Sequence, residues 1–438
     1  MQNSPPKEQL FMKKSDVLRN AKWIVGCKIM QSLLQLVIGM LTARYLGPSN
    51  YGLISYAASV VAFAVPIMQL GLRSTLVQEY VNHPEEEGEI LGTSLVMNIV
   101  ASAACMIGVV TFAAVANPGE TVTILVCLLY STSLFFQAIE MIQYWFQAKL
   151  MSRYPSVVML CTYFVVAMYR VYLLAEQKSV HWFAITHSVE YAIVGASLIV
   201  CYVKLSDQKI GFSLKLAKRM FSKSKYYIVS GLMVTIFQNT DHVMLKLMVG
   251  DVENGYYTTA VTCAGMTQFV FLAIIDSARP MILASRGSDL SKFEHEMSAL
   301  YSVIIYLALA QSVCFTVLAK LIVLVLYGSE YTSAIPVLRI VVWYVAFSCI
   351  GTIRNIWILA EGKQSILWTI NLCGALANVV LNAVLIPYFG ACGAALASTV
   401  TQFFTNFVMG FLLKPIRPNN KLILKGLDPR MAVSFVKK

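Results

Sequence analysis

Long apolar runs separated by short polar or Gly/Pro-marked breaks dominate this chain. A helix that crosses a bilayer needs about 20 mostly apolar residues, and about twelve runs have that length. A barrel strand would alternate apolar and polar residues, whereas these runs are apolar all round. The pattern therefore predicts an all-α integral membrane protein. The predicted spans are residues 21–43, 52–72, 92–115, 121–146, 155–174, 182–203, 226–249, 255–278, 298–326, 334–359, 365–387 and 391–413.

Composition strengthens this prediction. Of the 438 residues, 58% are hydrophobic and 13% are charged, so the polar surface of a soluble globule is missing. The first run exceeds the apolar region of a signal peptide and contains no small-residue cleavage site, so we expect it to stay as a helix.

The net charge of +12 follows the expected topology. Most of the 34 basic residues fall before the first run, in the segment 203–225 and after residue 413, and basic loops stay in the cytoplasm. We expect both termini on the cytoplasmic side of a bacterial inner membrane. Because the basic residues are scattered over separate segments, anionic membrane lipid is a better partner for them than nucleic acid.

Motifs for catalysis and cofactors are missing from the sequence. The ten cysteines form no C-x-x-C, the five histidines form no H-E-x-x-H, and no phosphate-binding loop occurs. We expect no cofactor and a transporter rather than an enzyme, driven by the membrane potential or an ion gradient. The enzyme alternative is a membrane glycosyltransferase or polysaccharide polymerase, but the predicted external loops are short.

A Gly-bearing turn recurs after about 200 residues. "LTARYLGPSNYGLISYA" aligns with "LKLMVGDVENGYYTTAV", which pairs Gly47 with Gly250, Gly52 with Gly255 and Ala57 with Ala260. Glycine supplies the positive φ that a tight reversal between two helices requires. The repeat predicts an N-terminal six-helix bundle, a basic linker, a second six-helix bundle and a basic tail, at residues 1–203, 204–225, 226–413 and 414–438.

Six spans in each half place both bundles in the membrane in the same orientation, so a pseudo-two-fold axis should run along the membrane normal. Two such bundles can enclose a central cleft that opens alternately to either side. This architecture is typical of a transporter.

Several segments resemble one superfamily. "TARYLGPSNYG", "NTDHVMLKLMVGDVENGYYTTA", "LAEGKQ" and "NVVLNAVLIPYFGACGAALASTVTQF" are similar to the patterns of the oligosaccharide (Wzx-type) flippases, which belong with the multidrug and toxin extrusion exporters and the lipid II flippases. The resemblance covers essentially the whole chain. Twelve spans match the oligosaccharide flippases better than the fourteen usual for lipid II flippases.

The resemblance implies that the substrate is a polyprenyl-diphosphate-linked oligosaccharide repeat unit, turned from the inner to the outer leaflet for O-antigen, capsule or exopolysaccharide synthesis. Membrane lipids, a polysaccharide polymerase and glycosyltransferases are then the expected partners. A cation-coupled multidrug exporter is the alternative. In the exporter relatives an acidic residue in the first span serves cation coupling, and the first span here has none.

Charged residues inside spans cost about 2.5–3.5 kcal/mol each on insertion scales, which makes them candidates for function. They fall at two depths, and a diphosphate could pass from one to the other. The inner tier holds Lys28, Glu140 and Arg354, with Arg73, Asp276 and Arg279 at the rim, and the outer tier holds Arg170, Glu190, Asp241, Lys246, Lys320 and Arg339.

Long basic side chains near helix ends can instead snorkel to the headgroups, which we expect more often than ligand contact for Arg170, Lys246, Lys320 and Arg339. Lys28 shares a helix face with Gln31 and Gln35, a polar stripe that a cavity would accept and lipid would reject. For Lys28 and Arg354, cavity lining and pairing with Glu140 stay open alternatives. The predicted cationic substrate site is Lys28, Arg354, Arg73, Arg279, Lys246 and Arg339 with Gln31 and Gln35.

Asp241 is the candidate for ion coupling. It lies deep in its span beside His242, where it can bind a proton or Na⁺ or pair with a cation such as Lys246. Near the C-terminus, Gly390, Ala394 and Ser398 follow a small-xxx-small spacing that we interpret as close helix packing.

Overall fold

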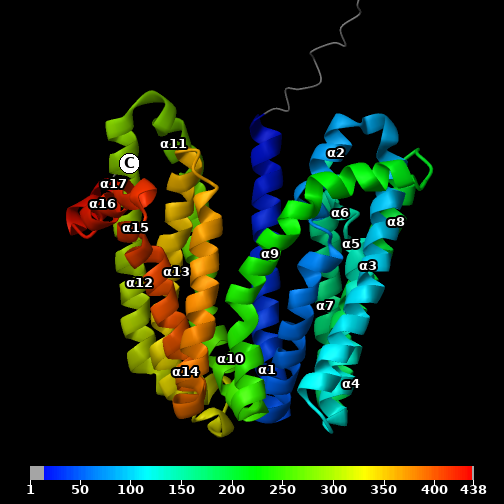
Figure 1. The fold of residues 1–438 in the computed structure, drawn as a ribbon, viewed down its shortest axis with the longest axis horizontal. Helices are drawn as coiled ribbons and strands as arrows, with labels where there is room; N and C mark the ends of the chain where they lie inside the picture. Colours follow the sequence, from blue (N-terminus) through cyan, green and yellow to red (C-terminus); the bar gives the residue numbers. More distant parts are fainter. Residues whose placement is uncertain (1–13, 437–438) are drawn as a thin grey trace, which may run out of the picture. The chain divides into compact units, whose positions relative to one another are not determined.

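The computed structural model of the protein describes residues 14–436, and these are almost entirely helical (Figure 1). In the first half the helices are α1 (Lys14–Met68), α2 (Leu76–Asn82), α3 (Glu87–Ala116), α4 (Thr121–Ser131), α5 (Ser133–Glu140), α6 (Gln143–Ala148), α7 (Arg153–Ala175) and α8 (Val180–Leu205). In the second half they are α9 (Leu214–Val249), α10 (Asp251–Gly265), α11 (Gln268–Ser288), α12 (Leu290–Leu326), α13 (Ala334–Ala360), α14 (Ile366–Phe403), α15 (Met409–Leu412), α16 (Arg417–Lys425) and α17 (Pro429–Val436).

Short 3₁₀ or π turns complete the chain: η2 (Leu72–Ser74), η3 (Pro84–Glu86), η4 (Ser329–Tyr331), η5 (Phe404–Val408) and η6 (Lys414–Ile416). Of these, η5 is a π-helix that continues α14.

Nine helical segments of the described chain are long and apolar enough to cross a membrane. Two of them, Met30–Met68 and Ile366–Leu412, each hold two predicted spans, so the nine account for eleven of the twelve. The remaining one, residues 226–249, lies in α9. The eighth predicted span, 255–278, is interrupted: α10 ends at Gly265 and α11 begins at Gln268.

The positive φ predicted for the turn glycines is confirmed at Gly47 and Gly250, whereas Gly52 and Gly255 lie in regular helix. Gly47 has φ 70° and ψ 171°, and Gly250 has φ 102° and ψ 178°. Gly328 and Gly390, each between two predicted spans, also have positive φ, at 92° and 53°. A side chain with a Cβ rarely adopts this conformation, so glycine suits all four positions: Gly47 and Gly390 break α1 and α14, Gly250 precedes α10 and Gly328 precedes η4.

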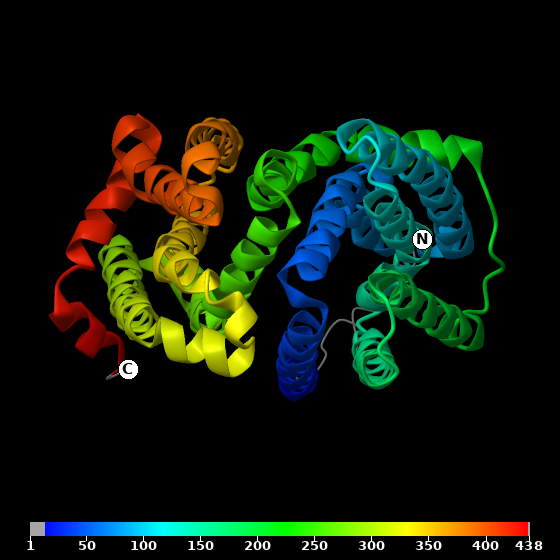
Figure 2. The ribbon, with the colours of Figure 1, turned by 90° about the horizontal axis from the view of Figure 1, so that it is seen from below.

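The chain divides into two compact units. Unit 1 comprises residues 14–39, 67–108 and 128–228, and unit 2 comprises residues 40–66, 109–127 and 229–436. In unit 2, α10, α12, α13 and α14 pack around one large apolar core; α12–α14 are yellow to orange-red in Figures 1 and 2. In unit 1, α5 and α7 pack on α8, and a second core includes Leu72, Trp145 and Tyr202. The predicted bundle boundaries stay a prediction.

The predicted basic linker is bound to unit 1 along its length. Gly211 N donates to Gly88 O over 3.1 Å, and the Gln208 amide contacts both Gly88 N and Pro84 O, at 3.0 and 2.9 Å. These bonds fix the extended segment 206–213 against the start of α3. The linker is therefore a strap rather than a free connection.

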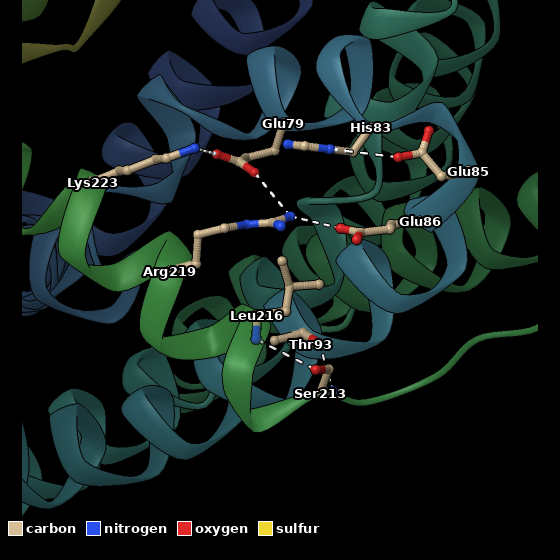
Figure 3. A network of polar contacts seen from close by, with 9 residues as sticks. All are labelled: Glu79, His83, Glu85, Glu86, Thr93, Ser213, Leu216, Arg219 and Lys223. Carbon is tan, nitrogen blue, oxygen red and sulfur yellow. Dashed lines mark hydrogen bonds and ion pairs between the residues drawn. The ribbon is translucent and has the colours of Figure 1, made fainter.

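Ion pairs continue this attachment into the first turns of α9 (Figure 3). Arg219 Nη2 lies 2.7 Å from Glu86 Oε2 and 3.4 Å from Glu79 Oε2, and Lys223 Nζ lies 2.6 Å from Glu79 Oε1. The hydrogen bond that Arg219 donates to Glu86 raises the pKa of the Arg219 guanidinium above its usual value. The beginning of α9 belongs to unit 1 and its end to unit 2, and α1, α3 and α4 are likewise divided between the units.

Candidate functional site

The Asp241 carboxylate is buried in unit 2, with 4% of the residue exposed. Asn378 and Asn382 of α14 donate to its Oδ1 over 3.0 and 2.5 Å. Tyr257 of α10 donates to Oδ2 over 2.5 Å, and Ser398 of α14 donates to the same oxygen. Four neutral donors therefore solvate one buried negative charge, two on each oxygen.

Lys246 does not pair with Asp241, contrary to one of the two predicted roles. Its ammonium lies 2.7 Å from Glu120 Oε2 and 2.7 Å from Asp251 Oδ2, and only 5% of its side chain is exposed. Asp251 is the first residue of α10 and Glu120 lies before α4, so the ammonium reaches the end of its span, and its predicted contact with headgroups stays a prediction. Among the described residues, no cation forms an ion pair with Asp241. In the part of the chain that the structure describes, its hydrogen-bond partners are therefore all neutral groups.

The hydrogen bonds of His242 define which of its ring nitrogens carries the proton. Asn254 Nδ2 donates to Gly52 O over 2.7 Å, so its Oδ1 faces His242 Nδ1, 2.9 Å away. An amide oxygen only accepts, so Nδ1 carries the proton. In the neutral ring Nε2 is then an acceptor, and within the described chain no residue donates to it.

A cavity of about 140 Å³ opens beside these residues, entirely within unit 2. It lies against the interruption between α10 and α11, where Ala264, Gly265 and Gln268 line it. The polar or aromatic side chains around it are Phe237, Gln238, Asp241, His242, Tyr257, Gln268 and Tyr344.

Arg354 lies inside unit 2, with 4% of the residue exposed. Its Nη1 donates to Thr405 O in the π-helix η5 over 2.7 Å, and Nη2 donates to Asn355 Oδ1 over 3.3 Å. The Nε atom is buried without a partner. Arg354 thus donates to a backbone carbonyl of the irregular segment η5, and its contact with substrate stays a prediction.

The predicted polar stripe of α1 meets polar residues of unit 1. Gln35 Nε2 donates to Tyr163 Oη over 3.0 Å, and Gln31 and Glu190 also interact with Tyr163. Arg170 Nη2 lies 3.9 Å from Glu190 Oε2, and the snorkelling predicted for Arg170 stays a prediction. Of Lys28, the third member of the stripe, the backbone in α1 is described and the side chain lies outside the described part.

The remaining predicted cations are accessible. Arg73 in η2 and Arg339 in α13 are exposed, and Arg279 in α11 forms an exposed pair with Asp276 at 3.0 Å. Glu140 accepts a hydrogen bond from Gln143 Nε2 over 3.0 Å and interacts electrostatically with Arg73. The substrate contacts predicted for these cations stay predictions.

Sequence reasoning predicted none of the four donors to Asp241, which are Tyr257, Asn378, Asn382 and Ser398. Asn378 and Asn382 are spaced i, i+4 within an otherwise apolar run, a signal that marks one polar helix face. Ser398 was assigned to helix packing alone. That interpretation was incomplete, since its hydroxyl donates to Asp241.

Residues 17–286 match the family described as "Polysaccharide biosynthesis protein", so the chain belongs to that family. It is 21% identical over 396 residues to the capsular polysaccharide biosynthesis protein CapF of Staphylococcus aureus, covering 88% of this chain and 96% of CapF. It is 24% identical over 312 residues to an uncharacterised membrane protein of Methanocaldococcus jannaschii, covering 67% of this chain and 60% of that protein.

Among solved structures, the inward closed conformation of the lipid II flippase MurJ is similar, with a TM-score of 0.73 at 15% identity over 95% of this chain and 92% of MurJ. Together with the helical content, this likeness confirms the predicted fold class, an all-α multi-pass membrane protein with about twelve spanning segments in two bundles. The predicted resemblance to the polysaccharide flippases is confirmed as well.

Proposed function

We propose that this protein is a flippase that moves polyprenyl-diphosphate-linked oligosaccharide repeat units from the inner to the outer leaflet of the cytoplasmic membrane. The observation that carries the proposal is a fold like that of a lipid II flippase on a chain of the polysaccharide biosynthesis family. Alternating access of the two bundles, with both termini in the cytoplasm, is the mechanism we propose. The product would be a cell-surface polysaccharide.

The substrate carries about two negative charges next to many hydroxyls, so its path needs cations outside hydrocarbon. Arg73, Arg279 and Arg339 are exposed and available for this role. Lys246 is neutralised by two carboxylates, which argues against it as a direct ligand. Lys28, Gln31 and Gln35 remain proposed wall residues of the path.

Asp241 is the residue we propose for coupling to a proton or Na⁺. Hard cations prefer oxygen ligands, and Asp241, Asn378, Asn382 and Ser398 supply them if the two amides rotate. The Asn382 Oδ1 is buried without a partner, so it has an unused lone pair at this site. The residues present therefore fit a small monovalent cation.

The membrane potential is a further drive. One charge crossing 100 mV is worth about 2.3 kcal/mol, so a dianion leaving a negative interior would gain roughly 4–5 kcal/mol. Flipping that continues unchanged after the potential is collapsed would contradict this part of the proposal.

The deciding experiment is a leaflet-accessibility assay in proteoliposomes with a fluorescent polyprenyl-diphosphate oligosaccharide. We expect protein-dependent exposure of the sugar, and we expect Asp241→Asn to remove stimulation by an Na⁺ or proton gradient. Asp207→Asn, in the exposed strap, is the matched control and should retain stimulation. Absence of flipping by the wild type, with efflux of cationic drugs instead, would favour the exporter alternative.

A further inference from the structure

We infer that the cavity at the α10–α11 interruption binds one neutral sugar ring of the transported headgroup through Gln238, His242 and Gln268. This inference rests on the proposed function and adds a second recognition element to it. The cavity is distinct from the cations that would hold the diphosphate, because the residues that line it include no Lys or Arg.

The cavity lies next to the break in helical structure between α10 and α11. α10 ends at Gly265, which is 15 residues and about 22 Å from the start of that helix, well inside a hydrocarbon core of about 30 Å. Irregular backbone is tolerated at such depth where protein buries it or where it lines a polar cavity. Gln311 of α12 satisfies one freed carbonyl by donating to Ala264 O over 3.1 Å. Discontinuous helices of transporters commonly mark substrate sites.

Size limits what the cavity can hold. Its volume of about 140 Å³ is close to the roughly 150 Å³ of an engineered protein cavity that binds benzene, a six-membered ring. It can therefore admit one small ring but not a whole oligosaccharide or a polyprenyl tail. One sugar unit is the part of the headgroup that matches this size.

The free hydrogen-bonding groups select hydroxyls. Both oxygens of Asp241 are already occupied by four donors, so this carboxylate is not available to a ligand without rearrangement. The Nε2 atom of His242 accepts, and the amides of Gln238 and Gln268 each offer a donor and an acceptor. A hydroxyl also both donates and accepts, whereas a phosphate would need cations that this cavity does not contain.

Aromatic side chains complete the environment. Phe237 and Tyr344 line the cavity, and the electron-rich face of an aromatic ring favours contact with the weakly positive C–H groups of a sugar. Val341 and Val345 close it with apolar surface. A site built to hydrogen-bond hydroxyls rejects analogues that lack them, so the cavity would contribute to selection among repeat units.

Binding is tested on the full-length protein in nanodiscs by saturation-transfer NMR. The probes are glucose, galactose, mannose, N-acetylglucosamine, N-acetylgalactosamine and the oligosaccharide released from the cell's own polyprenyl carrier. We expect at least one probe to bind saturably, and Gln268→Leu to weaken it by about tenfold or more through the lost hydrogen bonds. Gln364→Leu, the same change on an exposed residue outside the cavity, should bind like the wild type.

Val261→Phe provides a second variant, which fills the cavity without removing a polar group, and it should abolish binding. Saturable binding of no probe, or equal binding by the wild type and both cavity variants, would overturn the inference.

Flipping measurements separate this inference from the proposed function. We expect Gln268→Leu to slow the lipid-linked oligosaccharide more than polyprenyl phosphate, which lacks a sugar. If the wild type flips the oligosaccharide and the ratio of the two rates is the same in Gln268→Leu, the sugar subsite is wrong and the flippase stands. If the wild type flips neither substrate, the proposed function fails, whatever the result of the binding test.

Discussion

Thr258 Oγ1 donates a hydrogen bond to Ser55 Oγ over 2.8 Å, and these two residues are 203 positions apart. The same offset relates Gly47 to Gly250 and Gly52 to Gly255. A Cβ on Gly52 would collide with the carbonyl of Asp251, and a Cβ on Gly255 would collide with the carbonyl of Pro48. Pro48 and Asp251 are themselves related by the same offset of 203 positions. The two copies of the sequence repeat therefore contact each other reciprocally inside unit 2.

This reciprocal contact predicts a strong penalty for a methyl group at its centre. Gly52→Ala and Gly255→Ala should each lower the free energy of unfolding by about 1–3 kcal/mol, because a backbone carbonyl cannot move aside as a flexible side chain can. Gly39→Ala is the control in the same helix α1, since an added Cβ there meets no atom within 4 Å. Thermal unfolding in detergent, followed by size-exclusion chromatography, measures the difference. Equal midpoints for all three variants would contradict the close contact.

The fold could be predicted from sequence because its determinants are local. Apolar runs of bilayer length and a glycine between consecutive runs are legible in one chain, and Gly47 and Gly250 adopt the positive φ that their position predicts. The interruption at Gly265 was not predicted. The residues around it are apolar enough to continue a helix, and the Gln311 side chain that satisfies Ala264 O comes from α12, 47 positions away.

The site was predicted only in part, for a similar reason. An acid such as Asp241 within a span is conspicuous in any sequence, but its partners come from two other helices. Lys246 is the cation nearest to Asp241 along the chain, but its ammonium pairs with Glu120, which lies 126 positions earlier. No pattern in the sequence indicates that pair. Tertiary contacts thus decide which charges are free and which are paired.

Glu120 makes the stability of unit 2 depend on pH. The hydrogen bond from Lys246 is the main cause that lowers the pKa of the Glu120 carboxyl, which lies between two spanning segments. Because the unfolded value is about 4.3, Glu120 contributes stability above that pH, and the contribution is lost as the pH falls through the lower folded value. The effect is small, since 48% of the side chain is exposed.

We therefore expect Glu120→Gln to unfold at a lower temperature than the wild type at pH 7, with the difference vanishing as the pH falls below about 4. Glu176→Gln, an exposed residue in another loop, should show no such trend. A difference between Glu120→Gln and the wild type that persists at low pH would mean that the side chain acts through packing instead of charge.

The strap predicts a local change in dynamics. Replacing Arg219 and Lys223 together by Gln removes the pairs with Glu79 and Glu86 that hold the first turns of α9. Only 3% of the Glu79 side chain is exposed, so its pairs are worth more than the roughly 0.2–1 kcal/mol of a surface pair, and amide exchange in residues 206–220 should rise by about tenfold or more. Lys218→Gln, on the exposed side of the same helix, is the control. Hydrogen exchange with mass spectrometry gives the answer, and unchanged protection would show that the side-chain bonds of Gln208 and the backbone bond of Gly211 suffice.

Substitution of Arg354 should affect stability and transport to different extents. Its guanidinium is buried without a carboxylate partner in the described residues, and a buried cation is costly to desolvate. Arg354→Met loses the bond to Thr405 O but also removes that cost, so we expect its free energy of unfolding to stay within about 2 kcal/mol of the wild type.

If Arg354 or Lys28 contacts the diphosphate during transport, Arg354→Met and Lys28→Ala should reduce flipping while Lys320→Ala, on an exposed position of α12, retains it. Flipping rates and unfolding midpoints are measured on the same preparations. Equal flipping losses in all three variants would show that the two tiers of charge have no functional meaning, and a large destabilisation by Arg354→Met alone would make Arg354 a structural support of the π-helix.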